Sequence, residues 1–270
     1  MPTGIKQRFT QGWDLAAEGY DALNAHFVRL GVRLAERADL YPGDRVLDVA
    51  CGTGAVALAA ARRVGPQGHV TGVDLAPAMA ARARENAAAA GVTNATFLQM
   101  DAEALEFPGE SFTAALSGLG LFFLPDMPRG LAEIARVLQP GGRLAFTAFG
   151  KGFLEPLNSL LAARIKAYDL PRNPLVKQMS WEPQALRDLV EAAGFFLVRA
   201  EREEGEVVFP TPDAWWGMLW HGAFRAFAYD ADPERLARFR AEHLAEVAPL
   251  AAADGLHVRL PVITVQGVHT

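Results

Sequence analysis

The sequence predicts an α/β fold built on a mostly parallel sheet, and two observations carry this prediction. Short apolar runs alternate with segments of helical periodicity over residues 45–149. A glycine-rich turn, residues 51–54, stands directly between the first apolar run and the helical segment that follows it. Strands that alternate with helices of roughly 10 to 14 residues form right-handed βαβ units, whose strands are parallel. We therefore expect one parallel sheet covered by helices.

The first 150 residues contain the regular part of the pattern. Two amphipathic helices, 13–23 and 25–38, come first, and Gly19 weakens the first of them. The apolar runs that we predict as strands are 45–50, 69–74, 95–100, 112–118 and 143–149. The helical segments between them are 55–64, 77–90 and 127–138. Turns are expected at 41–44 and 140–142, which both contain Pro-Gly.

The second half is less regular, and we expect it to complete a single domain spanning residues 1–270. Helices are predicted at 154–168, 183–193 and 232–247, and strands at 195–201 and 258–268. Pro261 inside the last strand indicates an edge position or a bulge, because proline cannot donate a ladder hydrogen bond. Neither an internal repeat nor a long linker divides the chain.

Composition and charge narrow the classes of function. The chain has 270 residues, of which 51% are hydrophobic and 21% charged, a balance typical of globular proteins. Its formal charge is −5, so it lacks the overall basic field of a nucleic-acid-binding protein. Cys51 is the single cysteine, which excludes an intrachain disulfide and a CxxC metal site. No signal peptide and no run of about 18 apolar residues is visible, so we expect a cytoplasmic protein without a membrane partner or a metal.

The glycine-rich turn predicts that a ligand approaches the backbone closely. Gly52, Gly54 and Ala57 fit the dinucleotide pattern G-x-G-x-x-A, and Asp74 stands at the spacing of its ribose-binding acid. Asp48 helps to separate two kinds of cofactor. A dinucleotide would bring a pyrophosphate near this carboxylate, which would repel it, whereas S-adenosylmethionine (SAM) brings an ammonium and a sulfonium. Asp48 therefore favours SAM, and the alternative is that it only caps or orients the turn.

Two further acids stand at the ends of predicted strands. Asp74 can accept hydrogen bonds from both ribose hydroxyls, or it can cap the helix that opens near Pro77. Asp101 can accept from an adenine amino group while the backbone N–H of Ala102 donates to the ring, or it can be an ordinary turn aspartate. Ligands of open α/β sheets bind outside the carboxyl ends of the strands. Three acids at three successive strands therefore favour the binding roles.

In combination these motifs resemble a known family. The segments that carry the resemblance are 46–54, Asp74, 100–108, 133–144 and, at the N-terminus, 13–21. They look like a class I SAM-dependent methyltransferase, most of all the group around the ubiquinone and menaquinone biosynthesis C-methyltransferases. The resemblance implies a Rossmann-like, seven-stranded, mostly parallel sheet with an antiparallel last strand, which residues 258–268 would supply. It also implies a SAM-binding half at about residues 10–150, followed by the remaining strands and an acceptor-side cover at about residues 151–270.

The resemblance further implies which residues lie near SAM. It places Asp48 and Gly52 near the methionine moiety, and Ser117 in the wall of the site. The complete set of expected cofactor contacts is Tyr20, Asp48, Gly52, Gly54, Asp74, Leu75, Asp101, Ala102 and Ser117. Ala50 departs from the glycine of many members, a small change that we expect to be tolerated. No catalytic residue carries over, because residues 121–123 offer neither an acid nor a base.

We expect a methyltransferase that acts on a small, largely hydrophobic acceptor. Residues 211–227 are rich in aromatic side chains, and this part of the family often covers the acceptor. Trp215, Trp216 and Trp220 have helical spacing that fits core packing as well as a pocket. His221 titrates near neutrality when unperturbed, so it is either a base or a structural histidine. The alternatives are a nicotinamide-dependent oxidoreductase and a SAM-binding protein without turnover.

Overall fold

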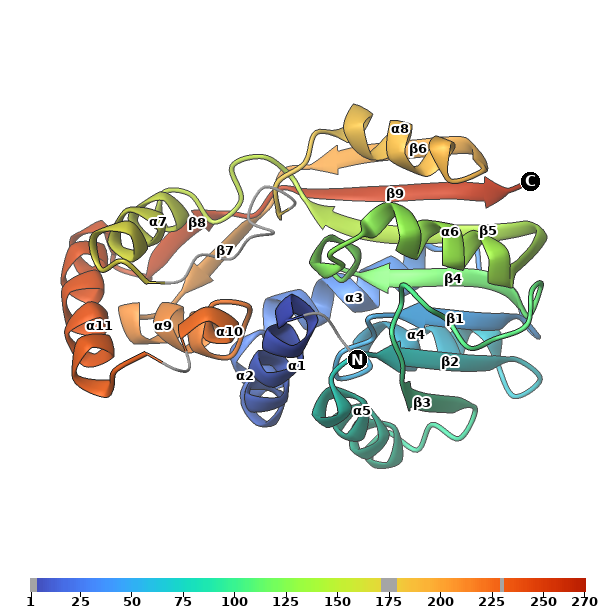
Figure 1. The fold of residues 1–270 in the computed structure, drawn as a ribbon, viewed down its shortest axis with the longest axis horizontal. Helices are drawn as coiled ribbons and strands as arrows, with labels where there is room; N and C mark the ends of the chain where they lie inside the picture. The colour runs from blue at the N-terminus through green and yellow to red at the C-terminus, as the bar shows by residue number, and fades with distance from the viewer. Residues whose placement is uncertain (1–3, 171–178, 229–230) are drawn as a thin grey trace.

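The computed structural model describes residues 4–170, 179–228 and 231–270, and its centre is a seven-stranded sheet (Figure 1). The strand order is β3-β2-β1-β4-β5-β9-β6. These strands are β1 (Arg45–Val49), β2 (His69–Asp74), β3 (Ala95–Gln99), β4 (Phe112–Gly118), β5 (Leu138–Phe149), β6 (Phe195–Glu203) and β9 (Val262–His269). Only β9 runs antiparallel to its neighbours, β5 and β6. The predicted mostly parallel sheet with an antiparallel last strand is confirmed.

Helices cover both faces of this sheet. The helices α3 (Ala25–Arg37), α4 (Ala55–Val64) and α5 (Pro77–Ala89) pack on one face, and α6 (Met127–Val137) and α8 (Pro183–Ala192) pack on the other. Successive strand residues point to opposite faces, so Val46 belongs to the first of these cores and Leu47 to the second. Both side chains are fully buried. Burial on both faces is why the strands appear in the sequence as continuous apolar runs.

A second group of elements, which we call the cap, lies beyond the carboxyl ends of the parallel strands (Figure 1). It consists of α7 (Leu157–Ala167), α9 (Pro212–Trp220), α10 (Arg225–Ala228), α11 (Pro233–Val247) and a two-stranded antiparallel sheet of β7 (Glu206–Phe209) and β8 (Leu256–Arg259). The helices α1 (Gly4–Ala16) and α2 (Tyr20–Leu23) lie between the cap and the main sheet and contact α10 and α9, respectively. The carboxyl ends of the strands therefore face α1, α2 and the cap.

The predicted last strand is wrong in its extent. It divides at Leu260 and Pro261, so that β8 pairs with β7 in the cap and β9 enters the main sheet. Pro261 lies at this division, and β9 is an interior strand rather than an edge strand. The proline cannot donate a ladder hydrogen bond, which suits a position where the chain leaves one sheet for another. Strand β7 was not predicted.

The N-terminal helix also differs from the prediction. It begins at Gly4 rather than at residue 13, and a 3-10 turn at Ala17–Gly19 separates it from α2. At Gly19 the ring of His221 approaches so closely that an added Cβ would lie 2.6 Å from its Cδ2 atom. Gly19, which was expected to weaken the helix, therefore lies where the N-terminal segment packs closely against the cap. The turn expected at residues 140–142 lies within β5.

Across residues 4–170, 179–228 and 231–270, no helix combines the length and the apolar character needed to cross a membrane.

Candidate functional site

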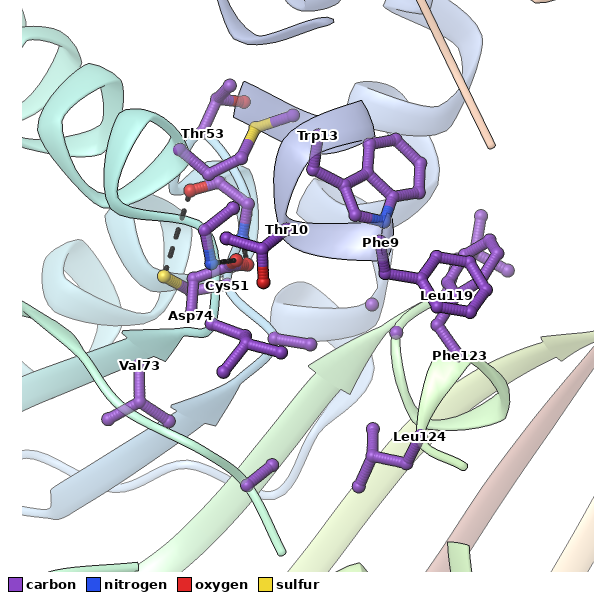
Figure 2. A pocket seen from close by; sticks show the side chains of 18 of the residues that line it. Phe9, Thr10, Trp13, Cys51, Thr53, Val73, Asp74, Leu119, Phe123 and Leu124 are labelled. Atoms are coloured by element: carbon purple, nitrogen blue, oxygen red, sulfur yellow. Dashed lines mark hydrogen bonds between the residues drawn. The ribbon is translucent and has the colours of Figure 1, made fainter. Parts of the chain in front are cut away.

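A cavity of about 150 Å³, which we call the first cavity, opens at the carboxyl ends of β1, β2, β3 and β4. Figure 2 shows Asp74 and Cys51 on its sheet side, with Phe9 and Trp13 of α1 across from them. Six of the nine predicted contacts line this cavity: Tyr20, Gly52, Asp74, Leu75, Asp101 and Ala102. The carboxyl edge of a parallel sheet is where α/β proteins bind ligands, so the structure brings these residues together at the expected place.

The turn after β1 exposes its backbone to this cavity. Gly52 and Gly54 have φ angles of 53° and 90°, which glycine adopts without steric cost. A Cβ added at Gly52 would meet no atom within 4 Å, so open space faces this residue. Ala50 adopts a φ of 53° without being a glycine, which costs roughly 1–2 kcal/mol. A glycine at this position would adopt the same angle without the strain.

Asp74 connects the ends of β1 and β2. Its Oδ2 accepts a hydrogen bond from the N–H of Gly52 at 2.8 Å, and its Oδ1 accepts one from the N–H of Ala76 at 2.9 Å. Burial raises the pKa of this carboxyl to about 6, although the two backbone hydrogen bonds act in the opposite direction. Each oxygen keeps a free lone pair, so the carboxylate can still accept from two hydroxyls of a ligand.

Lys6 of α1 closes the cavity at the end of β3, and the sequence did not indicate this residue. Its Nζ lies 2.6 Å from Oδ2 of Asp101 and 2.5 Å from Oε2 of Glu103. Burial opposes the charge of Lys6, but the hydrogen bonds and charges of the two acids outweigh it and raise the pKa of the ammonium. Oδ1 of Asp101 also accepts from the N–H of Glu103 at 2.9 Å. Two donors therefore hold the carboxylate of Asp101 in place.

Three of the predicted contacts, Asp48, Gly54 and Ser117, do not line the cavity. Asp48 is fully buried and lies outside the wall of the first cavity. Burial raises the pKa of its carboxyl well above the usual range. The structure therefore places this side chain away from the first cavity, where burial favours its neutral form, and it does not support the argument that Asp48 repels a pyrophosphate.

The other two residues support the wall of the cavity from behind. Gly54 faces Ala83 and Phe97, where a Cβ would lie 3.1 Å and 3.3 Å from the nearest atoms. Ser117 is fully buried behind Gly120, at which an added Cβ would lie 2.9 Å from the Ser117 Oγ. Direct contacts were expected from both, and neither residue lines the first cavity. The thiol of Cys51 is buried, which raises its pKa well above the usual range and supports a packing role.

Aromatic side chains form the wall opposite the sheet. The rings of Trp13 and Phe123 pack edge to face with centroids 5.3 Å apart, and Phe9 packs against Phe123 in the same way at 5.9 Å (Figure 2). The rings of Tyr20 and Trp13 also pack edge to face, with their centroids 6.1 Å apart. Burial raises the pKa of the Tyr20 hydroxyl well above its usual range, so this group stays protonated at neutral pH. It can donate a hydrogen bond and is unsuited to act as a base.

A second cavity, of about 500 Å³, adjoins the first and extends into the cap. Five residues line both cavities: Trp13, Tyr20, Phe27, Leu119 and Phe123. Most of the remaining wall is apolar and comes from the end of β5, from α7 and from the α9–α10 region, and includes Phe149, Phe153, Leu161, Met218, Leu219 and Phe224. Its other polar side chains, within the described ranges, are Asn24, Asn158 and Lys166.

The tryptophans of α9 do not line the second cavity in this structure. Trp215 is fully buried, and its Nε1 donates to Nε2 of His243 at 3.0 Å. Trp216 stacks on Trp220 with the ring planes 12° apart. Core packing is thus the correct interpretation of this helical pattern. His221 also lines neither cavity, and its Nδ1 pairs with the backbone oxygen of Gly217 at 3.1 Å. The side chain of Phe227 lies outside the described part of the structure.

The charges of the site are concentrated at the strand ends. Lys6, Asp101 and Glu103 form one ion-pair cluster, and Asp74 is held by backbone N–H groups. Among the described residues that line both cavities, Tyr20 alone carries a titratable side chain. The site can therefore hold a polar ligand in the first cavity beside an apolar ligand in the second, but no described residue places a carboxylate or imidazole where the two meet.

Comparisons with known proteins agree with this geometry. A sequence model described as a methyltransferase domain matches residues 46–142. The chain is 38% identical to aklanonic acid methyltransferase DauC from Streptomyces sp. (strain C5) over 205 residues, or 74% of this chain and 89% of that one. It is 32% identical to nocamycin O-methyltransferase from Saccharothrix syringae over 269 residues, or 94% and 96% of the two chains.

Two further proteins, one compared by sequence and one by structure, are more distantly similar. Demethylmenaquinone methyltransferase from Symbiobacterium thermophilum is 35% identical over 158 residues, covering 56% of this chain and 63% of its own length. The solved structure of Haemonchus contortus phosphoethanolamine N-methyltransferase 2 in complex with SAM aligns with a TM-score of 0.61 at 19% identity. That alignment covers 99% of this chain and 60% of the other, and it establishes a shared fold.

Proposed function

The chain belongs to the SAM-dependent methyltransferases, and from this premise we propose that it transfers the methyl group of SAM to an acidic oxygen of a small, largely apolar molecule. The acceptor would bind in the second cavity. The resemblance seen in the sequence is confirmed, and membership in this family sets aside the nicotinamide-dependent oxidoreductase. SAM is the cofactor.

The observation that carries the proposal is the common wall of the two cavities. A methyltransferase must bring the acceptor atom in line with the S–CH₃ bond of the sulfonium, at near-attack distance. Trp13, Tyr20, Phe27, Leu119 and Phe123 border both cavities, so ligands held in the two cavities meet there. The aromatic and aliphatic character of this border also favours the exclusion of water.

We assign the ends of the cofactor by the chemistry of the first cavity. Asp74 would accept from the ribose hydroxyls, with Leu75 beside it in the wall. Asp101 and the backbone of Ala102 would meet the adenine at the end that Lys6 covers. Gly52 and Tyr20 would lie near the methionine moiety. In this assignment, residues of about 10–150 bind SAM. Residues of about 151–270 complete the sheet and form most of the acceptor wall.

An acidic oxygen suits the chemistry of the common wall. In the transfer step the acceptor oxygen attacks the methyl carbon, the O–CH₃ bond forms, and the S–CH₃ bond breaks with its electron pair passing to sulfur. A base is required only if the oxygen must lose a proton as it attacks. Tyr20 stays protonated and is the titratable side chain that borders both cavities in the described part of the chain. An oxygen that is already ionised near neutral pH needs no such base.

Two relatives that this chain covers over most of their length support oxygen as the acceptor atom. One is named for an acid and the other as an O-methyltransferase. The match to the demethylmenaquinone methyltransferase covers only 56% of this chain. Its shorter extent makes it the weaker guide to the acceptor of this chain.

A panel of acceptors with labelled SAM tests this proposal. Aromatic carboxylic acids, acidic phenols, hydroquinones and neutral alcohols of matched ring size would be offered, and products identified by mass and by the NMR shift of the new methyl group. We expect O-methylation of the acids or acidic phenols. Exclusive C-methylation of hydroquinones would contradict the choice of oxygen. SAM binding without transfer to any member of the panel would contradict the proposal as a whole.

A further inference from the structure

Lys6 of α1 lies outside residues 46–142, which match the methyltransferase domain, yet it reaches the end of β3. Its side chain is 11% exposed, and its Nζ contacts Oδ2 of Asp101 and Oε2 of Glu103. All three residues line the first cavity. A lysine is rarely buried to this extent unless it is paired, so these two acids account for its position.

The two acids are held in different ways. Oε1 of Glu103 accepts a hydrogen bond from the N–H of Asp126 at 2.7 Å, and the Glu103 side chain is only 8% exposed. The side chain of Asp101 is 33% exposed in the wall of the first cavity, and its second donor is the N–H of Glu103. Of the two carboxylates, Asp101 is therefore the one that a ligand can reach and the one that is free to turn.

Lys6 controls the direction of the Asp101 carboxylate. One oxygen of each acid lies within 2.6 Å of the same nitrogen, so the two negative groups are close neighbours. Among the ion pairs of the described residues, Lys6 alone reaches either acid. Without this cation the two carboxylates would repel each other, and the more exposed Asp101 would turn away.

We propose that Lys6 is a positioning residue for the adenine of the cofactor: it keeps the Asp101 carboxylate directed into the first cavity, where that carboxylate accepts from the 6-amino group. This inference rests on the proposed function, which places the adenine at this end of the cavity. Each oxygen of Asp101 accepts from one donor of the protein and keeps a lone pair for the ligand. Recognition of the adenine then depends on α1 as well as on the strand end that carries Asp101.

Binding of two nucleosides tests the inference without requiring methyl transfer. The probes are 5′-methylthioadenosine and its analogue that lacks the 6-amino group, and calorimetry on the full chain would measure both affinities. We expect the amino group to strengthen binding about tenfold in the unaltered protein. In Lys6→Met this preference should fall to about twofold or less, whereas Lys6→Arg should retain it. Lys151→Met, which breaks an exposed ion pair with Glu182, is the control and should keep the full preference.

The ratio of the two affinities separates positioning from other roles of Lys6. If Lys6 only docked α1, or contacted the purine ring itself, Lys6→Met would weaken both probes equally and leave the ratio unchanged, which would overturn the inference. Equal binding of the two probes by the unaltered protein would overturn it as well. Neither probe carries a sulfonium, so a failure here leaves the proposed methyl transfer intact, and a failure of the acceptor panel would not alter these affinities.

A double variant tests the electrostatic part of the account. In Lys6→Met combined with Glu103→Gln, the repulsion of like charges is absent, and the new side-chain amide can donate to Asp101. We expect this double variant to recover most of the preference that Lys6→Met loses. No recovery would contradict the role of Lys6 in neutralising Glu103.

A structure of the unaltered protein with S-adenosylhomocysteine (SAH) keeps the inference testable if Lys6→Met does not fold. We expect the 6-amino group within hydrogen-bond distance of Asp101, with Lys6 still paired to the same carboxylate. An adenine that displaces Lys6 from Asp101, or that binds away from Asp101, would contradict the inference.

Discussion

The two cavities of this methyltransferase meet at one aromatic wall, yet they are built in opposite ways. The first is made at the ends of four neighbouring strands, and its charged groups are fixed by backbone N–H donors and by Lys6. The second is larger and mostly apolar, and its wall is drawn from α1, α2, α3, α7 and the α9–α10 region as well as the end of β5.

This difference separates the common part of the reaction from the specific part. The cofactor needs directed hydrogen bonds to its ribose and adenine, which short segments at strand ends can supply. The acceptor needs shape, exclusion of water and few polar anchors, which side chains from distant elements can supply together. Under the proposed function, the acceptor cavity could therefore change through the cap while the strand ends continue to hold SAM.

The largest effect is expected from Trp215→Ala, which tests whether α9 serves the cap as core rather than as a pocket wall. Trp215 is fully buried and hydrogen-bonded to His243, so its truncation should lower the free energy of unfolding by roughly 3–5 kcal/mol. Trp220→Ala is the matched control, since Trp220 is only half-buried and should lose less. Denaturant unfolding measures both. Equal, small losses would remove Trp215 from the core of the cap.

Asp74→Ala should weaken SAM binding by about 1–3 kcal/mol, because it removes charge-assisted hydrogen bonds to two hydroxyls. It also frees the N–H of Gly52 from its partner in the turn. Calorimetry with SAM would measure the change, with Glu85→Ala on the exposed surface of α5 as the control. Unchanged affinity in a folded Asp74→Ala protein would reject the ribose role.

The pH dependence of cofactor binding should follow Asp74 as well. Burial raises the pKa of this carboxyl to about 6 in the free protein, and the ligand requires the ionised form. Affinity should therefore be constant well above pH 6 and fall by about tenfold per pH unit below it. The probe is 5′-methylthioadenosine, which carries the ribose diol and no group that titrates between about pH 5 and 8. An Asp74→Asn protein with the same pH profile would assign the titration to another group.

The smallest effect is expected from Tyr20→Phe. The ring would keep its contact with Trp13, while the loss of one hydrogen bond to the methionine moiety should weaken SAH binding by about 0.5–1.5 kcal/mol. Tyr41→Phe, at an exposed position outside both cavities, is the control and should leave the affinity unchanged. If both variants bind SAH equally well, the Tyr20 hydroxyl makes no hydrogen bond to the cofactor, and only its ring contributes to the wall.

The fold, and the placement of six of the nine expected residues around the first cavity, could be predicted because their signals are local. Each strand end carries its own turn, acid or glycine, and parallel strands bring those ends to one edge. Asp48 was expected in the wall of the first cavity because only its position along the chain was considered, and not the direction of its side chain. The strand period of two puts Asp48 on the same face as Val46, which belongs to the core under α3 and α4.

What could not be predicted depends on contacts between distant residues. Lys6 reaches Asp101 across 95 positions of sequence, and no local motif marks such a pair. The wall of the second cavity combines Asn24, Leu119 and Phe153 with residues of the α9–α10 region. Taken alone, none of these residues differs from an ordinary core residue. The division at Pro261 was missed because a proline in an apolar run signals an interruption without showing that the chain changes sheets.

The claim that the two cavities have separate tasks is tested most directly by filling one of them. Ala163 lines the second cavity from α7 at an exposed position, and Ala167 on the same helix is exposed but lines neither cavity. Methyl transfer to the acceptor found in the panel, and SAH affinity, would be measured for Ala163→Trp and for Ala167→Trp. We predict that Ala163→Trp lowers transfer by about tenfold or more while SAH affinity stays unchanged, and that Ala167→Trp alters neither. Full transfer in Ala163→Trp, or a loss of SAH binding that parallels the loss of transfer, would contradict the separation.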